Sequence, residues 1–333
     1  MTFAGRSSES GPPSNRVRVL VVDDSALMRK ILSEILGSSP EIEVVGTARD
    51  GRDAAVQTAR LKPDVITLDV QMPEVSGLEA LPSLLAIHEA KVVMVSALTK
   101  EGADVTLQAL ELGAVDFLPK PDRNQLAEMR GLSDLLTSKI LTAAQSRVRR
   151  PRRSTMTSSS SSSASTIAPP RPAMPTAPTS GDSGRVRACV VIGISTGGPQ
   201  AISQIIPSLT PPLPPIVIVQ HMPGQFTGVF AERLNRSAAV PVKEAREGDR
   251  VLPDQILVAP GGRHLTLMGI PATARVVLSD PDQPAVSGHK PSVDVAMQSA
   301  ARIFQGGTVG VLMTGMGRDG VDGCKAILAA EGM

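Results

Sequence analysis

A short stretch near the middle of the chain places a serine among the glycines of a tight turn. It runs from Gly193 to Gly197 with Ser195 at its centre, and it fits the G-x-S-x-G pattern of a nucleophile elbow. The apolar run 186–192 before it predicts a buried strand, and Pro199 after it is favoured in the first turn of a helix. A serine on such a turn holds its hydroxyl above the sheet edge, beside the free N–H groups of the helix N-terminus. The pattern therefore favours nucleophilic attack with stabilisation of an oxyanion.

Two other interpretations of this turn remain open at this point. A glycine-rich turn at a helix N-terminus also binds phosphate or dinucleotides. The dinucleotide fingerprint, however, places a glycine where Ser195 stands and an acidic residue about 20 positions later. The chain instead reads Val219-Gln220-His221 there. In the third interpretation the turn is structural and its serine has no chemical role.

A serine nucleophile needs a base, and the base needs an acid to orient it. Among the histidines, only His221 directly follows a predicted parallel strand (216–220), as Ser195 does; the others are His88, His264 and His289. Asp319 lies on a glycine-flanked loop after a third strand (309–314). Because parallel strands end at one edge of a sheet, we predict that the three side chains meet there. Their order along the chain differs from that of the α/β-hydrolases, which favours a Rossmann-like sheet instead.

Acidic side chains also gather at predicted strand ends in the first third of the chain. Asp23 and Asp24 follow one strand, and Asp69 follows another. Three carboxylates at one edge repel each other unless a cation binds, and an all-oxygen site suits Mg²⁺. Ser96 and Lys120 end two further strands and could hold phosphoryl oxygens. This edge is therefore predicted to carry phosphate chemistry.

The elements that position these residues alternate between strands and helices, which predicts two doubly wound parallel sheets. In the N-terminal part, strands are expected at 17–22, 42–47, 65–68, 92–95 and 114–118. Helices there are expected from 26 to 36 and near 51–60, 76–88, 102–112 and 123–145. In the C-terminal part, helices are expected after Pro199 and near 225–236, 291–304 and 321–330, with short strands within 250–278.

The composition agrees with aliphatic α/β cores. Of 333 residues, 41% are hydrophobic but only 2% aromatic, so base stacking on aromatic side chains is nearly excluded. The net charge of +2 indicates no particular partner. Cys189 and Cys324 lie in separate apolar segments without a C-x-x-C pattern. We therefore expect both to be core residues, in a protein of a reducing compartment. With no signal peptide or long apolar run, we expect a cytoplasmic protein without direct membrane insertion.

Residues 17–122 resemble a two-component receiver domain, which has a flavodoxin-like fold with a five-stranded parallel sheet. The matching segments are 22–25 (VDDS), 68–73 (LDVQMP) and 117–121 (FLPKP). The resemblance implies that Asp69 accepts the phosphoryl group and that Phe117 is an aromatic switch residue. The Mg²⁺ ligands that it implies are Asp23, Asp24, Asp69 and the backbone carbonyl of Gln71. It also implies that Ser96 and Lys120 bind the phosphoryl group.

The C-terminal part is similar to the catalytic domain of the chemotaxis protein-glutamate methylesterases, the CheB family. The segments that carry this similarity are 193–199 (GISTGGP), 220–223 (QHMP), 260–264 (PGGRH), 291–294 (PSVD) and 314–320 (TGMGRDG). The resemblance implies that Ser195 is the nucleophile, His221 the base and Asp319 its orienting acid. It also implies oxyanion donors, for which the candidates are the backbone N–H of Met316 and Thr196.

The same resemblance implies an activity and partners. The expected reaction removes methyl groups from glutamate methyl esters of chemoreceptors and deamidates receptor glutamines, with no cofactor for the esterase. A chemotaxis histidine kinase would be the phosphodonor, and no nucleic acid is expected as a partner. The alternative is a response regulator with a non-catalytic ligand-binding or DNA-binding effector. The C-terminal part shows no basic helix-turn-helix, which disfavours DNA binding.

We expect five segments along the chain and control by docking between the two domains. The segments are a disordered start (1–15), a receiver domain (16–122), its last helix (123–146), a Ser/Pro/Arg-rich linker (147–184) and a catalytic domain (185–333). The catalytic domain is expected to be incomplete at its C-terminus, since the family continues with another strand. A flexible linker transmits no torque, so the receiver is predicted to cover the Ser195 cleft until Asp69 is phosphorylated.

Overall fold

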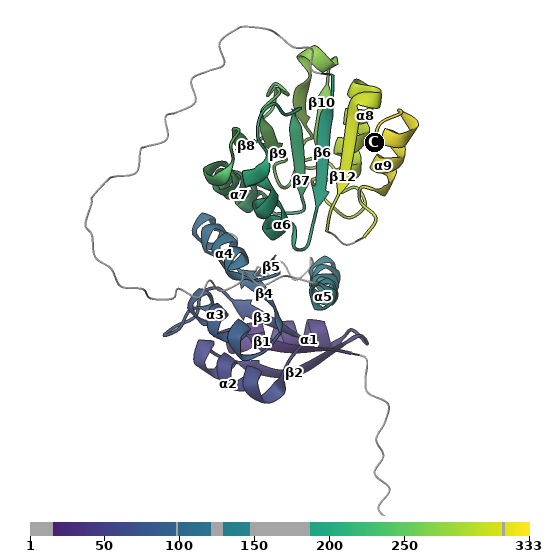
Figure 1. Cartoon of the computed structure of the whole chain (residues 1–333). Coiled ribbons are helices and arrows are strands. Elements are labelled where there is room, and N and C mark those ends of the chain that lie inside the picture. Colours follow the sequence, from purple (N-terminus) through teal and green to yellow (C-terminus); the bar gives the residue numbers. More distant parts are fainter. Residues whose placement is uncertain (1–15, 98, 121–128, 147–186, 315–316) are drawn as a thin grey trace, which may run out of the picture.

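The computed structural model describes residues 16–97, 99–120, 129–146, 187–314 and 317–333 (Figure 1). These residues form an N-terminal and a C-terminal unit, each built on a parallel sheet. The predicted disordered start and the predicted linker lie outside the described residues. Among the helices of the described ranges, none is both long enough and apolar enough to cross a membrane.

The N-terminal unit is a five-stranded parallel sheet with the strand order β2-β1-β3-β4-β5. Its strands are β1 (Val17–Val22), β2 (Ile42–Ala48), β3 (Val65–Asp69), β4 (Lys91–Ser96) and β5 (Asp116–Pro119). Its helices are α1 (Ala26–Gly37), α2 (Gly51–Leu61), α3 (Gly77–Ile87), α4 (Lys100–Leu112) and α5 (Met129–Gln145). The predicted alternation of strands and helices is confirmed. All five strands are parallel, and β2 is added on one side of β1 whereas β3, β4 and β5 are added on the other.

The C-terminal unit is a second parallel sheet with the order β12-β6-β7-β9-β8. Its strands are β6 (Cys189–Ile194), β7 (Ile216–Gln220), β8 (Val242–Glu244), β9 (Ile256–Val258) and β12 (Thr308–Leu312). An antiparallel hairpin, β10 (Leu265–Met268) and β11 (Arg275–Leu278), lies apart from this sheet. The helices are α6 (Gly198–Ile205), α7 (Gly224–Ser237), α8 (Val293–Phe304) and α9 (Val321–Ala329). The predicted doubly wound fold is confirmed, whereas the three-residue strand β8 was too short to predict from its pattern.

Both units bury aliphatic side chains on the two faces of their sheets. Helices α1 and α5 cover one face of the N-terminal sheet, and α8 with the hairpin covers one face of the C-terminal sheet. The opposite faces belong to one continuous apolar cluster that includes residues of α4, α6 and α7. The two units therefore pack through α4 on one side and through α6 and α7 on the other, as the ribbon view also shows (Figure 1).

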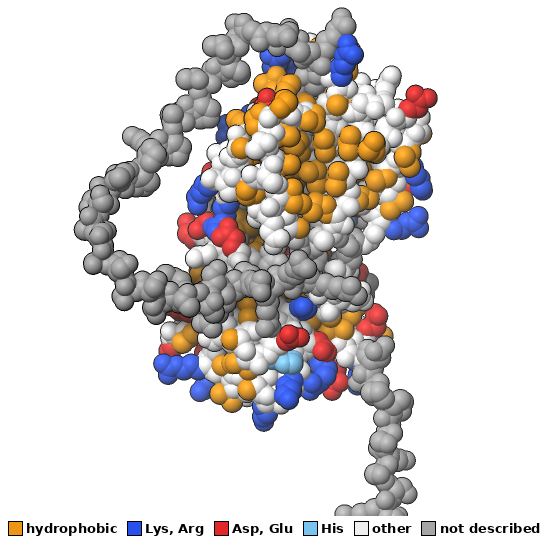
Figure 2. Space-filling model, in the orientation of Figure 1, with side chains coloured by type: hydrophobic (Ala, Val, Ile, Leu, Met, Phe, Trp, Pro, Cys, Tyr) orange, Lys and Arg blue, Asp and Glu red, His pale blue; other side chains and the backbone are white. Residues whose placement is uncertain are grey.

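The outer edge of β12 carries the last residues of the chain. The Met333 N–H donates to the Thr308 carbonyl at 2.9 Å, and the Gly310 N–H donates to the Met333 carbonyl at 2.7 Å. Figure 2 shows hydrophobic side chains gathered over this side of the C-terminal unit. Leu312 and Leu328 are among the exposed apolar residues of β12 and α9.

Candidate functional site

Ser195 lies on the tight turn between β6 and α6, as predicted. Its N–H donates to the Thr314 carbonyl at 2.8 Å, and its own carbonyl accepts the Gly198 N–H at 2.9 Å. Gly197 has a φ of +74°, a conformation that favours glycine. A Cβ at Gly198 would lie 2.3 Å from the Gln220 amide oxygen, so any other residue here would have to displace the Gln220 side chain. The two glycines thus let the chain turn sharply around the serine.

His221 and Asp319 lie beside the serine, and the three side chains line one cavity of about 130 Å³. The His221 Nε2 lies 2.8 Å from the Asp319 Oδ2. The other ring nitrogen, Nδ1, is buried and makes no hydrogen bond within the described residues. The ring therefore uses Nε2 for the acid and leaves Nδ1 for a proton from another group.

The Asp319 carboxylate is held at the N-terminus of α8. It accepts the Ser292 hydroxyl at 2.7 Å, the Val293 N–H at 2.7 Å and the Asp294 N–H at 3.0 Å. Burial raises the pKa of this carboxyl, but the hydrogen bonds from His221 and from these groups outweigh it and hold the pKa well below its usual range. Asp319 is therefore a fixed anion that orients the imidazole.

A second histidine, His289, stacks on His221 with ring centroids 3.7 Å apart and planes 6° from parallel. Burial, and then the neighbouring His221, lower the pKa of His289 to about 4, so this ring is neutral at pH 7. This residue lies in a loop and not at a strand end, so the sequence does not predict a role for it at the site. No pattern in the sequence indicates the stacking, which depends on how the loop folds back over the cavity.

Of the two candidate oxyanion donors, the structure describes only Thr196. Met316 lies outside the described residues. The Thr196 hydroxyl donates to the Asp116 Oδ2 of the N-terminal unit at 2.6 Å, and Thr196 is buried. The same carboxylate oxygen lies 2.8 Å from the Lys139 Nζ. The side chain that follows Ser195 is thus engaged by the other unit.

A larger cavity of about 680 Å³ opens beside Ser195 and His221, between the two units. The N-terminal unit contributes Phe117, Pro119, Leu135 and Lys139 to its lining. The C-terminal unit contributes, among others, Ser195, His221, Met222, Gly261 and His289. Access to the serine from this side is therefore bounded by the N-terminal unit.

Polar and aromatic contacts hold the two units together around this cavity. The Arg233 guanidinium binds Glu111 with two hydrogen bonds, of 3.1 and 2.7 Å, and Asp104 at 2.7 Å. The rings of Phe117 and Phe226 stack with centroids 4.4 Å apart. Arg233 and Phe226 both belong to α7, which therefore carries much of the docking surface.

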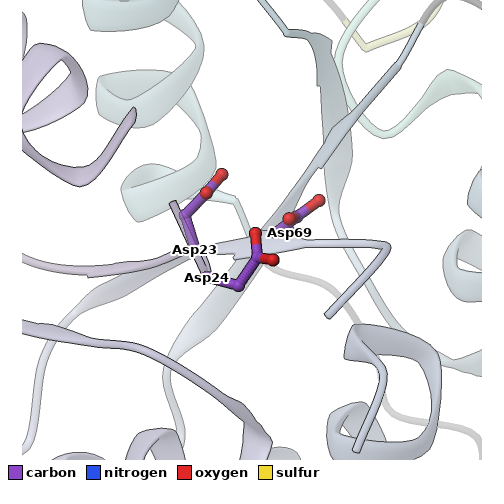
Figure 3. Close-up of side chains that lie close together, drawn as sticks. All are labelled: Asp23, Asp24 and Asp69. Carbon is purple, nitrogen blue, oxygen red and sulfur yellow. The ribbon is translucent and has the colours of Figure 1, made fainter. Parts of the chain in front are cut away.

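The predicted phosphorylation site lies at the carboxyl edge of the N-terminal sheet. Asp23, Asp24 and Asp69 place one carboxylate oxygen each within 4.8 Å of the others (Figure 3). The Lys120 ammonium lies 2.6 Å from Asp69 and 3.0 Å from Asp23. Burial raises the pKa of the Asp69 carboxyl to about 6, although Lys120 opposes this shift. A trio of carboxylates facing one ammonium keeps an excess of negative charge, and its hard oxygen ligands fit Mg²⁺.

Two further predicted residues border this edge. Ser96 ends β4 and is buried, and its hydroxyl is 3.3 Å from the carbonyls of Ala97 and Gly102. The Gln71 N–H donates to the Asp69 Oδ1 at 3.2 Å. The structure thus brings Asp23, Asp24, Asp69 and Lys120 together, with Ser96 and Gln71 at the rim.

Comparison with known proteins gives matches to both units. A family model described as CheB methylesterase matches residues 190–333, and one described as response regulator receiver domain matches residues 19–130. A protein-glutamate methylesterase/protein-glutamine glutaminase of Symbiobacterium thermophilum is 44% identical, over 95% of this chain and 85% of the relative. A protein of the same description from Methanococcus maripaludis is 39% identical, over 94% of this chain and 86% of the relative.

Solved structures match each unit separately. The catalytic domain of the Thermotoga maritima CheB methylesterase is 39% identical, with a TM-score of 0.42 over 44% of this chain and 77% of that domain. The response regulator domain of Thermotoga maritima CheB is 45% identical, with a TM-score of 0.37 over 40% of this chain and 99% of that domain.

Proposed function

Because the chain belongs to the family of protein-glutamate methylesterases/protein-glutamine glutaminases, we propose that Ser195, His221 and Asp319 are its catalytic triad. The single observation that carries this assignment is the shared cavity, in which Asp319 holds the Nε2 of His221 and leaves Nδ1 without another partner in the described part of the chain. The same arrangement disfavours the alternative of a non-catalytic effector, which would have no need of an oriented, largely buried imidazole.

The first half-reaction forms an acyl-enzyme. The Ser195 Oγ attacks the carbonyl carbon of a glutamate methyl ester while its proton passes to the Nδ1 of His221. Asp319 stabilises the resulting imidazolium. The tetrahedral intermediate then expels methoxide, which takes the proton from Nδ1 and leaves as methanol. With a glutamine substrate the same steps release ammonia.

The second half-reaction restores the enzyme. Water gives a proton to Nδ1 and attacks the acyl carbon, and the proton then returns to the Oγ of Ser195 as glutamate leaves. The N-terminus of α6 and the backbone N–H of Met316 would bind the oxyanion in both halves. No cofactor takes part in these steps.

The N-terminal unit is the proposed receiver, with Asp69 as the phospho-acceptor. Asp23, Asp24, Asp69 and the carbonyl of Gln71 would hold Mg²⁺, which when bound neutralises charge on the phosphoryl oxygens. Lys120 already contacts Asp69 and would bind the added phosphoryl group together with the Ser96 hydroxyl. The phosphodonor is a chemotaxis histidine kinase, and the substrates are methyl-accepting chemoreceptors, which the enzyme meets in the cytoplasm.

Docking of the receiver is the proposed means of control. The N-terminal unit bounds the cavity beside Ser195, and its Asp116 engages the hydroxyl of Thr196. Phosphorylation of Asp69 would shift the equilibrium toward an undocked form in which receptor helices reach the serine. The activated state is thus the form in which these contacts are broken.

Methanol release from methylated chemoreceptor tests the proposal. The intact chain should release methanol slowly, and faster after addition of a small-molecule phosphodonor with Mg²⁺. Ser195→Ala should abolish both rates, and Asp69→Asn should abolish only the increase. A Ser195→Ala variant with unchanged turnover would overturn the triad, and a salt-sensitive shift of DNA mobility would favour the alternative effector.

A further inference from the structure

Asp294 is a buried carboxylate that the proposed mechanism does not use. It lies in the first turn of α8 and is only 3% exposed. Burying a carboxylate is costly unless its oxygens are hydrogen-bonded. Its Oδ1 accepts the N–H of Gly320 at 2.9 Å and the N–H of Gly323 at 2.7 Å. Both donors belong to the start of α9, directly after Asp319.

The starts of α8 and α9 cap each other. Asp319 precedes α9 and accepts the N–H groups of Val293 and Asp294 at the start of α8. Asp294 in turn accepts two N–H groups at the start of α9, whose own N-cap residue, Gly320, has no side chain to do so. Each aspartate thus satisfies donors that the other helix leaves free. We call these four hydrogen bonds the reciprocal cap.

The reciprocal cap fixes the position of the proposed triad acid. Gly320 follows Asp319 immediately and has a φ of +101°, so the loop turns sharply at this point. A Cβ at Gly323 would lie 3.2 Å from the Asp294 Cα, so the two helix starts are in close contact there. If Asp294 releases the two N–H groups, the loop can move and carry the Asp319 carboxylate away from the imidazole.

We propose that Asp294 is a positioning residue for the esterase reaction, which holds the Asp319 loop through the N–H groups of Gly320 and Gly323. The inference rests on the proposed triad. Asp294 does not line either cavity beside Ser195 among the described residues. It should therefore affect turnover and leave substrate binding unchanged.

The test compares four variants of the full chain, activated by phosphodonor, for methanol release from methylated chemoreceptor. Asp294→Ala removes the acceptor oxygen, and its kcat should fall about 10²-fold at unchanged KM, the scale expected when a catalytic group is misplaced by about 1 Å. Asp294→Asn keeps one acceptor oxygen and should recover at least tenfold of that loss. Asp322→Ala is the matched control, because Asp322 is an exposed carboxylate in the first turn of α9 whose ion pair, among the described residues, is with Lys325 alone. Asp319→Asn reports on the triad itself.

The outcomes separate the two proposals. Asp294→Ala with kcat within twofold of the unmodified chain, or equal losses in the Ala and Asn variants, would refute the positioning role. Full activity in Asp319→Asn would refute the triad instead. Thermal unfolding shows whether each variant is folded. If Asp294→Ala is not folded, Asp294→Ser replaces it, because the shorter serine side chain cannot reach both N–H groups. The kcat of Asp294→Ser should lie at least tenfold below that of Asp294→Asn, and equal kcat values would overturn the proposal.

Discussion

Arg233 is the side chain whose removal should most directly release the docked receiver. Its guanidinium joins α7 of the C-terminal unit to Glu111 and Asp104 of the N-terminal unit. The arginine side chain is 15% exposed, whereas the two acids are about half exposed, at 53% and 54%. Solvent therefore screens both ion pairs, and each contributes no more than about 1 kcal/mol. The bidentate contact between Arg233 and Glu111 places the contribution of that pair near this upper limit.

The expected effect of removing Arg233 follows from the combined contribution of its two ion pairs to docking. Loss of about 1–2 kcal/mol of docking free energy changes the docking equilibrium by a factor of about 5–30. If only the undocked form is active, Arg233→Ala should raise the basal rate of methanol release by the same factor. The rate after phosphorylation should not change, because in the proposed mechanism phosphorylation already displaces the receiver. Raising the salt concentration should reduce the difference between the two proteins.

Arg236 provides the matched control on the same helix. It is exposed, and no ion pair is seen for it within the part of the chain that the structure describes. Arg236→Ala should keep the basal rate of the unmodified chain. A double-mutant cycle that combines Arg233→Ala with Glu111→Ala should show that the two losses of docking free energy do not add. The reasoning is refuted if Arg233→Ala keeps its basal rate within twofold, or if both arginine variants are equally activated.

Three further outcomes are expected. Ser195→Ala should lower kcat by on the order of 10³-fold or more without changing the thermal midpoint, as measured by methanol release and calorimetry. Gly320→Ala should lower the thermal midpoint and the activity together, because a Cβ there would lie 2.4 Å from a Leu312 methyl group at a φ of +101°. The depressed pKa of Asp319 stabilises the fold above the unfolded-state pKa of about 4, and this contribution is lost as the pH falls through the lower folded-state value. The unfolding free energy of the unmodified chain should therefore exceed that of Asp319→Asn by a constant amount above pH 4 and by less below it; a difference that persists at low pH would contradict this.

The sequence was sufficient to predict features that depend on parallel topology. Ser195 and His221 follow buried strands, and Asp319 lies on the loop after the edge strand β12. Parallel strands in one sheet end at one edge, so their meeting could be predicted without coordinates. The same argument placed Asp23 and Asp69 together. In both cases the residues are far apart in the chain but occupy equivalent positions in repeated strand–helix units.

Features that depend on loop paths or on docking could not be predicted. His289 stacks on His221 because the loop before α8 folds back, with a bridge between Val286 and His289 that no periodicity signals. The contact between Thr196 and Asp116 joins two units, and each residue alone has the sequence environment of an ordinary turn or strand. The choice of Nε2 for the Asp319 contact is likewise a matter of ring orientation.

The strand β5 offers a physical link between the two sites of the protein. Asp116 and Phe117 at its start contact the C-terminal unit, and Lys120 directly after its end contacts Asp69. At about 3.3 Å per residue, the four steps from Asp116 to Lys120 span roughly 13 Å. A phosphoryl group adds about −1.5 to −2 charges beside the Lys120 ammonium and so changes the contact that holds this end of the strand. Because Phe117 is buried and closely packed, a shift of β5 has to change its stacking on the C-terminal unit, or the hydrogen bond that Asp116 accepts from the Thr196 hydroxyl. The proposed control therefore needs no force through the predicted linker, since the strand itself joins the proposed phosphorylation site to the docking surface.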